Sequence, residues 1–152
     1  MFPRLNLPMN QLRLKKEDGK HLIFCLVRKK YLVLTPEEWV RQNLVSYLNQ
    51  DLGYPVSLMK IETQVKGGAR IKRADLIICN NLGEAHMLVE CKAPNEKLNK
   101  ETFFQVGRYN RYTSAALLLI SNGMEHFCCE LEDAEFKFLK TIPAYKPKLK
   151  TS

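Results

Sequence analysis

Apolar residues recur every three or four positions in the segment 35–53, and the residues with this spacing are Val40, Leu44, Tyr47, Leu48 and Leu52. This spacing predicts an amphipathic helix. Thr35 is the expected N-cap, Pro36 suits the first helical position, and Glu38 completes a capping box. Gly53 is typical of a residue that ends a helix. We therefore predict a helix that begins after Thr35 and ends before Gly53.

Short β-rich runs occupy much of the remaining chain. The segment 22–34 holds two of them around a basic turn, which predicts a hairpin or a pair of short strands. Three strand candidates follow at 56–65, 70–79 and 86–92, and tight turns favour an antiparallel meander. A second helix is predicted over 99–113, with Asn99 as its N-cap. The apolar run 115–121 suits a strand buried on both faces, and further strands are predicted over 124–131 and 134–139.

This order of elements predicts an α/β fold with a central mixed sheet. A chain of 152 residues, 45% of them hydrophobic, is expected to form one domain with a self-sufficient core. Within it we distinguish a basic N-terminal segment (1–21), a core (35–121), C-terminal strands (124–140) and a basic tail (141–152), whose stretch 146–150 is expected to fray.

The charge balance indicates a polyanionic partner. There are 24 Lys and Arg against 16 Asp and Glu, a net charge of +8, and residues 1–34 alone carry +6. Both a solvated arm and a phosphate-binding segment explain the N-terminal surplus. No apolar run approaches the roughly 20 residues of a membrane span, and residues 1–12 do not resemble a signal peptide. Five cysteines without a CxxC spacing predict buried free thiols, so we expect a cytoplasmic location.

Acidic and basic residues interrupt two of the predicted strands. Glu90 and Lys92 lie two apart in one strand and therefore share a face, and Asp75 opens the apolar part of the strand before it. The spacing allows Asp75 and Glu90 to meet across the ladder. Two carboxylates at one point suit a hard cation such as Mg²⁺, and a nearby lysine can stabilise developing phosphoryl charge. Ordinary cross-strand ion pairing, with no chemistry, is the alternative.

These three residues, in the order helix–strand–strand–strand–helix, resemble the PD-(D/E)xK nuclease superfamily. The downstream segment from Gln105 to Tyr109 resembles the Gln-x3-Tyr motif of type I restriction enzyme R subunits. Similarity to the N-terminal domain of these subunits extends from residue 34 to residue 123. One departure is Ala74, where the superfamily pattern has proline.

The resemblance implies a restriction-endonuclease-like αβββαβ core and a role for each matching residue. Asp75, Glu90 and the Cys91 carbonyl would bind Mg²⁺ or Mn²⁺, and Lys92 would be the catalytic lysine. Gln105 and Tyr109 would contact the nucleic acid backbone or support the metal site. A further metal-binding glutamate from the first helix is expected at Glu38, with Glu37 as the second choice.

Basic residues near these motifs are candidates for phosphate contact, and they are Lys66, Arg70, Lys72, Arg73, Arg108 and Arg111. Ordinary surface cations are the alternative interpretation of these side chains. No G-x-x-x-x-G-K-[ST] motif occurs in the 152 residues, so we expect no ATP binding and no motor activity. The expected function is metal-dependent hydrolysis of DNA, with other restriction or motor subunits as partners. The alternative is a non-catalytic DNA-binding or assembly module that retains the nuclease fold.

Overall fold

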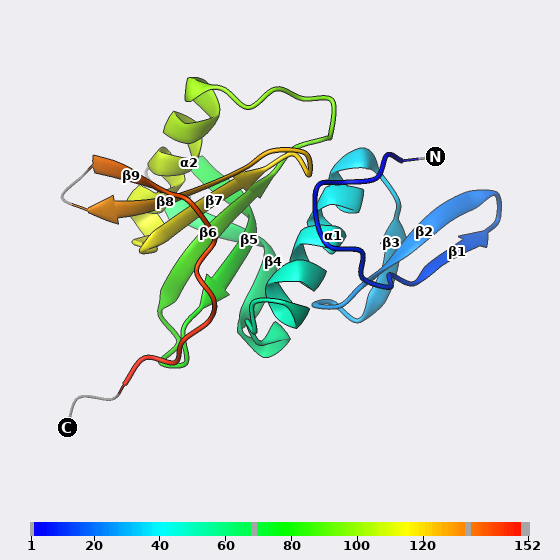
Figure 1. Cartoon of the computed structure of the whole chain (residues 1–152), viewed down its shortest axis with the longest axis horizontal. Helices are drawn as coiled ribbons and strands as arrows, with labels where there is room; N and C mark the ends of the chain where they lie inside the picture. Colours follow the sequence, from blue (N-terminus) through cyan, green and yellow to red (C-terminus); the bar gives the residue numbers. More distant parts are fainter. Residues whose placement is uncertain (1, 68–69, 133–134, 150–152) are drawn as a thin grey trace.

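The structure is a computed structural model that describes residues 2–67, 70–132 and 135–149, apart from the side chains of 62–73, 109, 111 and 112. Its described part contains two sheets and two α-helices, and the helix α1 lies between the two sheets (Figure 1). The elements in chain order are β1 (Leu14–Glu17), β2 (Lys20–Cys25), β3 (Lys30–Val33), α1 (Pro36–Gln50), the 3-10 turn η1 (Val56–Leu58), β4 (Met59–Gly67), β5 (Arg70–Cys79), β6 (Ala85–Cys91), α2 (Lys100–Thr113), β7 (Leu117–Ser121), β8 (His126–Glu132) and β9 (Glu135–Leu139).

Both helices begin at the caps that the sequence predicts. The Thr35 hydroxyl accepts a hydrogen bond from the Glu38 backbone N–H at 3.1 Å, and Pro36 occupies the first turn of α1. The Asn99 side chain accepts from the Thr102 N–H at 3.1 Å at the start of α2. Gly53 follows the end of α1 with a φ of +80°, a conformation that favours glycine. The predicted helices are therefore confirmed.

The larger sheet has the order β4-β5-β6-β7-β8-β9 among the described residues. Neighbouring strands are antiparallel except β6 and β7, which run parallel because α2 connects them as a crossover. The predicted mixed sheet is thus confirmed, together with the order of one helix, three strands, a second helix and a further strand. Some boundaries shift: residues 56–58 form η1 instead of the start of a strand, and β7 begins at Leu117.

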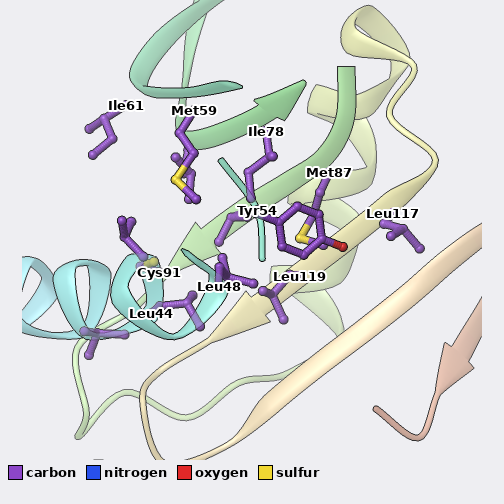
Figure 2. Packing of buried hydrophobic residues seen from close by; sticks show 14 of the residues in the cluster. Leu44, Leu48, Tyr54, Met59, Ile61, Ile78, Met87, Cys91, Leu117 and Leu119 are labelled. Carbon is purple, nitrogen blue, oxygen red and sulfur yellow. The ribbon is translucent and has the colours of Figure 1, made fainter. Parts of the chain in front are cut away.

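The two faces of this sheet bury separate apolar clusters. One face packs on α1 through residues such as Leu44, Leu48, Met87 and Leu119, and Tyr54 is buried among them (Figure 2). The other face packs on α2 around Val106. All five cysteines are buried and free, as the composition predicts. No helix in the described part of the chain is long and apolar enough to cross a membrane.

Two segments differ from their sequence-based predictions. Strand β1 was not expected, because its residues Leu14–Glu17 are exposed and show no apolar alternation. It pairs with β2 of the confirmed hairpin and completes a small antiparallel sheet of order β1-β2-β3. The second is the stretch 146–150, which was expected to fray: in its described part the Lys148 N–H donates to Asn81 Oδ1 at 2.6 Å and Asn81 Nδ2 donates to the Lys148 carbonyl at 3.0 Å. The residues just before it also return along the body of the molecule. Tyr54 Oη donates to the Pro143 carbonyl at 2.6 Å, and the Tyr145 N–H donates to the Leu52 carbonyl at 2.8 Å.

Candidate active site

The antiparallel pairing of β5 with β6 brings the predicted acids to adjacent strands. The ladder includes Ile77 opposite Leu88 and Leu76 opposite Val89, so Asp75 and Glu90 are the next positions in register. Opposed residues on neighbouring antiparallel strands lie close together. Asp75 and Glu90 therefore lie on adjacent strands, as the lengths of the two strands and of the turn between them predict.

Asp75 is fixed by hydrogen bonds from two different elements. Its Oδ2 accepts from the backbone N–H of Cys91 in β6 at 2.8 Å. Its Oδ1 accepts from Arg41 Nη2 in α1 at 3.2 Å. The carboxylate is one-fifth exposed, so it reaches solvent while both oxygens remain bonded. The Asp75 side chain of β5 thus links this strand to both α1 and β6.

Glu90 in β6 forms an ion pair with Lys92, which directly follows the end of this strand. Glu90 Oε1 lies 3.6 Å from Lys92 Nζ, with the two side chains 12% and 23% exposed. Glu90 is paired with Ile120 of β7, and Ile120 belongs to the cluster packed on α2. The charged pair therefore borders an apolar layer. A carboxylate so placed is expensive to ionise unless a cation is near.

The protonation of Glu90 responds to this setting. Burial, with a smaller contribution from the neighbouring Asp75 carboxylate, raises the pKa of Glu90 to about 8, although Lys92 acts in the opposite direction. Burial and the charge of Asp75 also raise the pKa of the Cys91 thiol. Cys91 therefore offers no thiolate at neutral pH, which leaves its carbonyl as the group that could hold a cation.

Glu38 lies in a buried network along α1. Its Oε1 accepts from Arg41 Nη1 at 2.5 Å and its Oε2 accepts from Gln42 Nε2 at 2.8 Å. Because Arg41 also bonds Asp75, it bridges the two carboxylates. Glu38 is thus connected to Asp75 on β5 through the Arg41 side chain. Glu37, the second choice for the metal-binding glutamate, is exposed.

Arg41 and Gln42 were not predicted as members of the site. Arg41 is 5% exposed and Gln42 fully buried, although both are polar residues. A signal was present for Arg41, since it lies three residues before Leu44 and four before Val45 and so falls on the apolar stripe of α1. A charged residue at such a position needs a buried partner.

Among the described residues, no group of three or more His, Cys, Asp and Glu side chains is arranged to hold a metal ion. Asp75 and Glu90 are two of the three acids predicted as metal ligands. The third, Glu38, accepts hydrogen bonds from Arg41 and Gln42 instead. The candidate metal ligands on β5 and β6 are therefore the two carboxylates and the backbone carbonyl of Cys91.

Comparison with known proteins identifies the family. The family model described as type I restriction enzyme R protein N terminus matches residues 36–143, which is well over half of the chain. The chain belongs to this family. The match begins with α1 and runs past β9, so it contains Glu38, Asp75, Glu90 and Lys92.

A solved structure supports the fold of this R-protein N-terminal domain. The chain is similar to a fragment described as an HsdR subunit of a type I restriction enzyme from Vibrio vulnificus YJ016, with a TM-score of 0.56 and 17% sequence identity. The similarity covers 73% of this chain and 24% of that one, so the chain spans about a quarter of the length of the structure it matches. No curated protein matches the chain.

The predicted residues of α2 lie one helical turn apart beside this sheet. Gln105 is exposed on the helix, and Tyr109 follows four residues later, with its side chain outside the described part. Val106, between them, is fully buried against the sheet. The helix therefore fixes the backbone positions of Gln105 and Tyr109 relative to β6 and β7.

The predicted phosphate-contact residues are only partly visible. Arg108 is exposed on α2 and its Nε donates to the Phe104 carbonyl at 3.4 Å. The side chains of the other five lie outside the described residues, and they are Lys66, Arg70, Lys72, Arg73 and Arg111. Their backbone positions place the first four on β4 and β5 and the last on α2. Their contact with phosphates stays a prediction.

Proposed function

We propose that this chain hydrolyses phosphodiester bonds of DNA with a divalent cation, as the nuclease part of a type I restriction system. The observation that carries the proposal is that Asp75 and Glu90 are the next positions in register of the β5–β6 ladder, close enough for Asp75 to raise the pKa of Glu90, and that Lys92 is ion-paired with Glu90. Membership in the R-protein N-terminal family supports it, and we assign the larger sheet with its two helices to the restriction-endonuclease-like (PD-(D/E)xK) architecture.

The residues present fit a hard divalent cation. Asp75 and Glu90 supply carboxylate oxygens, and burial together with the Asp75 carboxylate raises the pKa of Glu90 to about 8, so a bound cation would favour its ionised form. Asp75, Glu90 and the Cys91 carbonyl would hold the ion, which is proposed to be Mg²⁺ or Mn²⁺. Such an ion, when bound, lowers the pKa of a coordinated water and stabilises negative charge on a phosphoryl group.

The remaining residues are assigned roles around the scissile phosphate. Lys92 carries a positive charge next to Glu90 and would stabilise developing charge or orient the attacking water. Arg41 acts as a positioning residue, because it holds Asp75 Oδ1 from α1. Gln105 and Tyr109 are proposed to contact the DNA backbone or to support the acids from α2.

The proposed partners follow the same assignment. DNA is the proposed substrate, and its phosphates are proposed to be contacted by Arg108 and by the five basic residues whose side chains lie outside the described part. Other subunits of a restriction-modification system are the proposed protein partners, since the matched solved fragment is described as a subunit of a type I restriction enzyme.

One observation favours a second candidate, a DNA-binding or assembly module without catalysis. Glu38 is buried and bonds Arg41 and Gln42 through both carboxylate oxygens, whereas Asp75, also bonded through both oxygens, is one-fifth exposed. The described residues accordingly contain no group of three metal-ligating side chains. If two acids and one carbonyl hold a cation too weakly, the chain would bind DNA and leave it intact.

Cleavage of DNA separates the two candidates. Supercoiled plasmid and linear duplex would be incubated with the chain in Mg²⁺, in Mn²⁺ and in EDTA, alongside Asp75→Asn and Glu90→Gln. Metal-dependent nicking that each substitution lowers by at least a hundredfold supports hydrolysis at this pair of acids. Retention of DNA binding with no cleavage under any metal supports the second candidate instead.

A further inference from the structure

The small sheet β1–β3 turns one face toward α1 and the other away from it. Ile23 and Cys25 of β2 are fully buried, and Cys25 packs in the core cluster with residues of α1. Strand alternation places the intervening residues of β2 on the opposite face. Register adds residues of β1 and β3 to that outward face, because Phe24 pairs with Tyr31 and Leu22 with Lys15.

Two cations on the outward face lie over aromatic rings. The Arg13 guanidinium carbon is 4.2 Å from the centroid of Phe24, and Lys15 Nζ is 4.2 Å from the centroid of Tyr31. The two rings themselves meet edge to face at 5.2 Å. Cation–π contacts of this kind hold long side chains in place at the surface. Arg13 and Lys15 are therefore exposed and pre-positioned.

The charge around these residues is strongly positive. Between residues 13 and 30 there are seven Lys and Arg against two acids, and one of the acids, Glu17, already pairs with Lys15 at 2.8 Å. Lys20 lies opposite Glu17 in the β1–β2 register and is exposed. We define Arg13, Lys15 and Lys20 as the basic face of this sheet.

The basic face is separate from the candidate active site. The family match begins at residue 36, so β1–β3 lie outside the matched region. In the fold, α1 lies between this sheet and the larger one (Figure 1). Packing against α1 requires only the apolar face of the small sheet. The cations of the basic face are therefore not explained by the fold or by the candidate catalytic residues.

We propose that the basic face binds the phosphate backbone of duplex DNA, as a second contact outside the candidate active site. This second contact rests on the proposed function, in which DNA is the substrate. Duplex DNA presents about one negative charge per 1.7 Å of its axis, which complements a row of fixed cations on adjacent strands. Arg13 and Lys15 cover Phe24 and Tyr31, so the face offers charge to phosphates instead of bare rings to unstacked bases.

Binding in EDTA tests this independently of cleavage. The anisotropy of a labelled 20-base-pair duplex, and of its single strand, would be measured against salt for the full chain and for Arg13→Gln/Lys15→Gln/Lys20→Gln. The matched control is Lys137→Gln/Lys140→Gln/Lys146→Gln, which removes three exposed cations from the C-terminal part. We expect duplex affinity at least fivefold weaker than in the control, and a salt slope lower by about 2 to 3.

Glu17→Gln is a variant with the opposite expected effect on DNA binding, because it releases Lys15 from its ion pair and removes one negative charge. This variant is expected to tighten duplex binding by about twofold. Equal affinities and equal salt slopes for the two triple variants would overturn the proposal. Tighter binding of the single strand than of the duplex would overturn the assignment to duplex DNA. If the wild type shows no Mg²⁺-dependent cleavage in the separate nicking assay while the basic-face variant still binds duplex more weakly than the control, the result counts against the proposed hydrolysis and not against the basic face.

Discussion

Arg41 in α1 donates a hydrogen bond from Nη2 to Oδ1 of Asp75 in β5, at 3.2 Å. The same guanidinium binds Glu38 through Nη1, so one buried cation serves two carboxylates from different elements. This contact fixes the first helix against the interior strands β5 and β6, where Asp75 and Glu90 lie in adjacent positions. The position of α1 and the position of the candidate catalytic acids are therefore linked.

Replacing Arg41 by methionine tests this link. The variant keeps much of the side-chain volume but leaves Glu38 and Asp75 without their cation, so we expect a loss of about 3 kcal/mol in the free energy of unfolding at pH 7. Urea denaturation measures the loss. Glu38→Gln/Arg41→Met removes one of the stranded charges and is expected to recover part of the stability. A double variant no more stable than the single one would contradict the ion-pair account.

The raised pKa of Glu90 predicts how stability depends on pH. The folded chain holds this proton up to a pH of about 8, whereas the unfolded chain releases it near 4.5. Between these values the folded state binds more protons, so stability is greatest at the acid end and falls as the pH rises toward 8. Glu90→Gln should remove this slope and be about 4 kcal/mol more stable than the wild type at pH 8, because each unit of the pKa difference is about 1.4 kcal/mol. Thermal unfolding at pH 5 and pH 8 measures both effects, and a slope retained in Glu90→Gln would contradict the assignment.

Binding of a divalent cation should release the same proton. At pH 7 a carboxyl group with a pKa of about 8 is largely protonated, and a bound cation favours its ionised form. Titration of Mg²⁺ into the metal-free chain, in two buffers of different ionisation enthalpy, counts the protons. We expect release of nearly one proton per ion and a rise in Tm with Mg²⁺ concentration. Binding without proton release would show that the ion does not contact Glu90.

A glycine beside the sheet is expected to be irreplaceable for steric reasons. Gly123 has a φ of +87°, and a Cβ placed on it would lie 2.7 Å from Leu5 Cδ2. Gly123→Ala therefore combines backbone strain with overpacking and should cost about 2 kcal/mol or more in the free energy of unfolding. Gly83→Ala is the matched control, because Gly83 has a φ of +84° and open space around its Cβ position. Equal losses in the two variants would show that the contact with Leu5 is unimportant.

The sequence predicts most of the fold because its signals are local. Thr35 and Asn99 each accept the capping hydrogen bond that their positions indicate. Alternation within one strand was enough to place Glu90 and Lys92 together, and their ion pair at 3.6 Å agrees with it. The position of Asp75 next to Glu90 could be predicted from the length of the two strands and of the turn between them.

The features that the sequence did not predict depend on tertiary contacts. Strand β1 has no apolar alternation and exists because β2 offers it an edge to pair with. The C-terminal segment is held by Tyr54, which is distant in the sequence. The position of Arg41 on the apolar stripe of α1 indicates burial, but its partner Asp75 lies 34 positions later in the sequence. Local patterns contain no information about such pairings.

The rate at which the chain nicks supercoiled plasmid in Mg²⁺ tests the central claim most directly, when wild type is compared with Lys92→Ala. Lys137→Ala serves as the control, because it removes an exposed lysine from β9. We predict Mg²⁺-dependent nicking by the wild type and the control, and a loss of at least a hundredfold in Lys92→Ala with unchanged thermal stability. Nicking that survives in Lys92→Ala at the rate of the control would contradict the assignment of Asp75, Glu90 and Lys92 as the catalytic group.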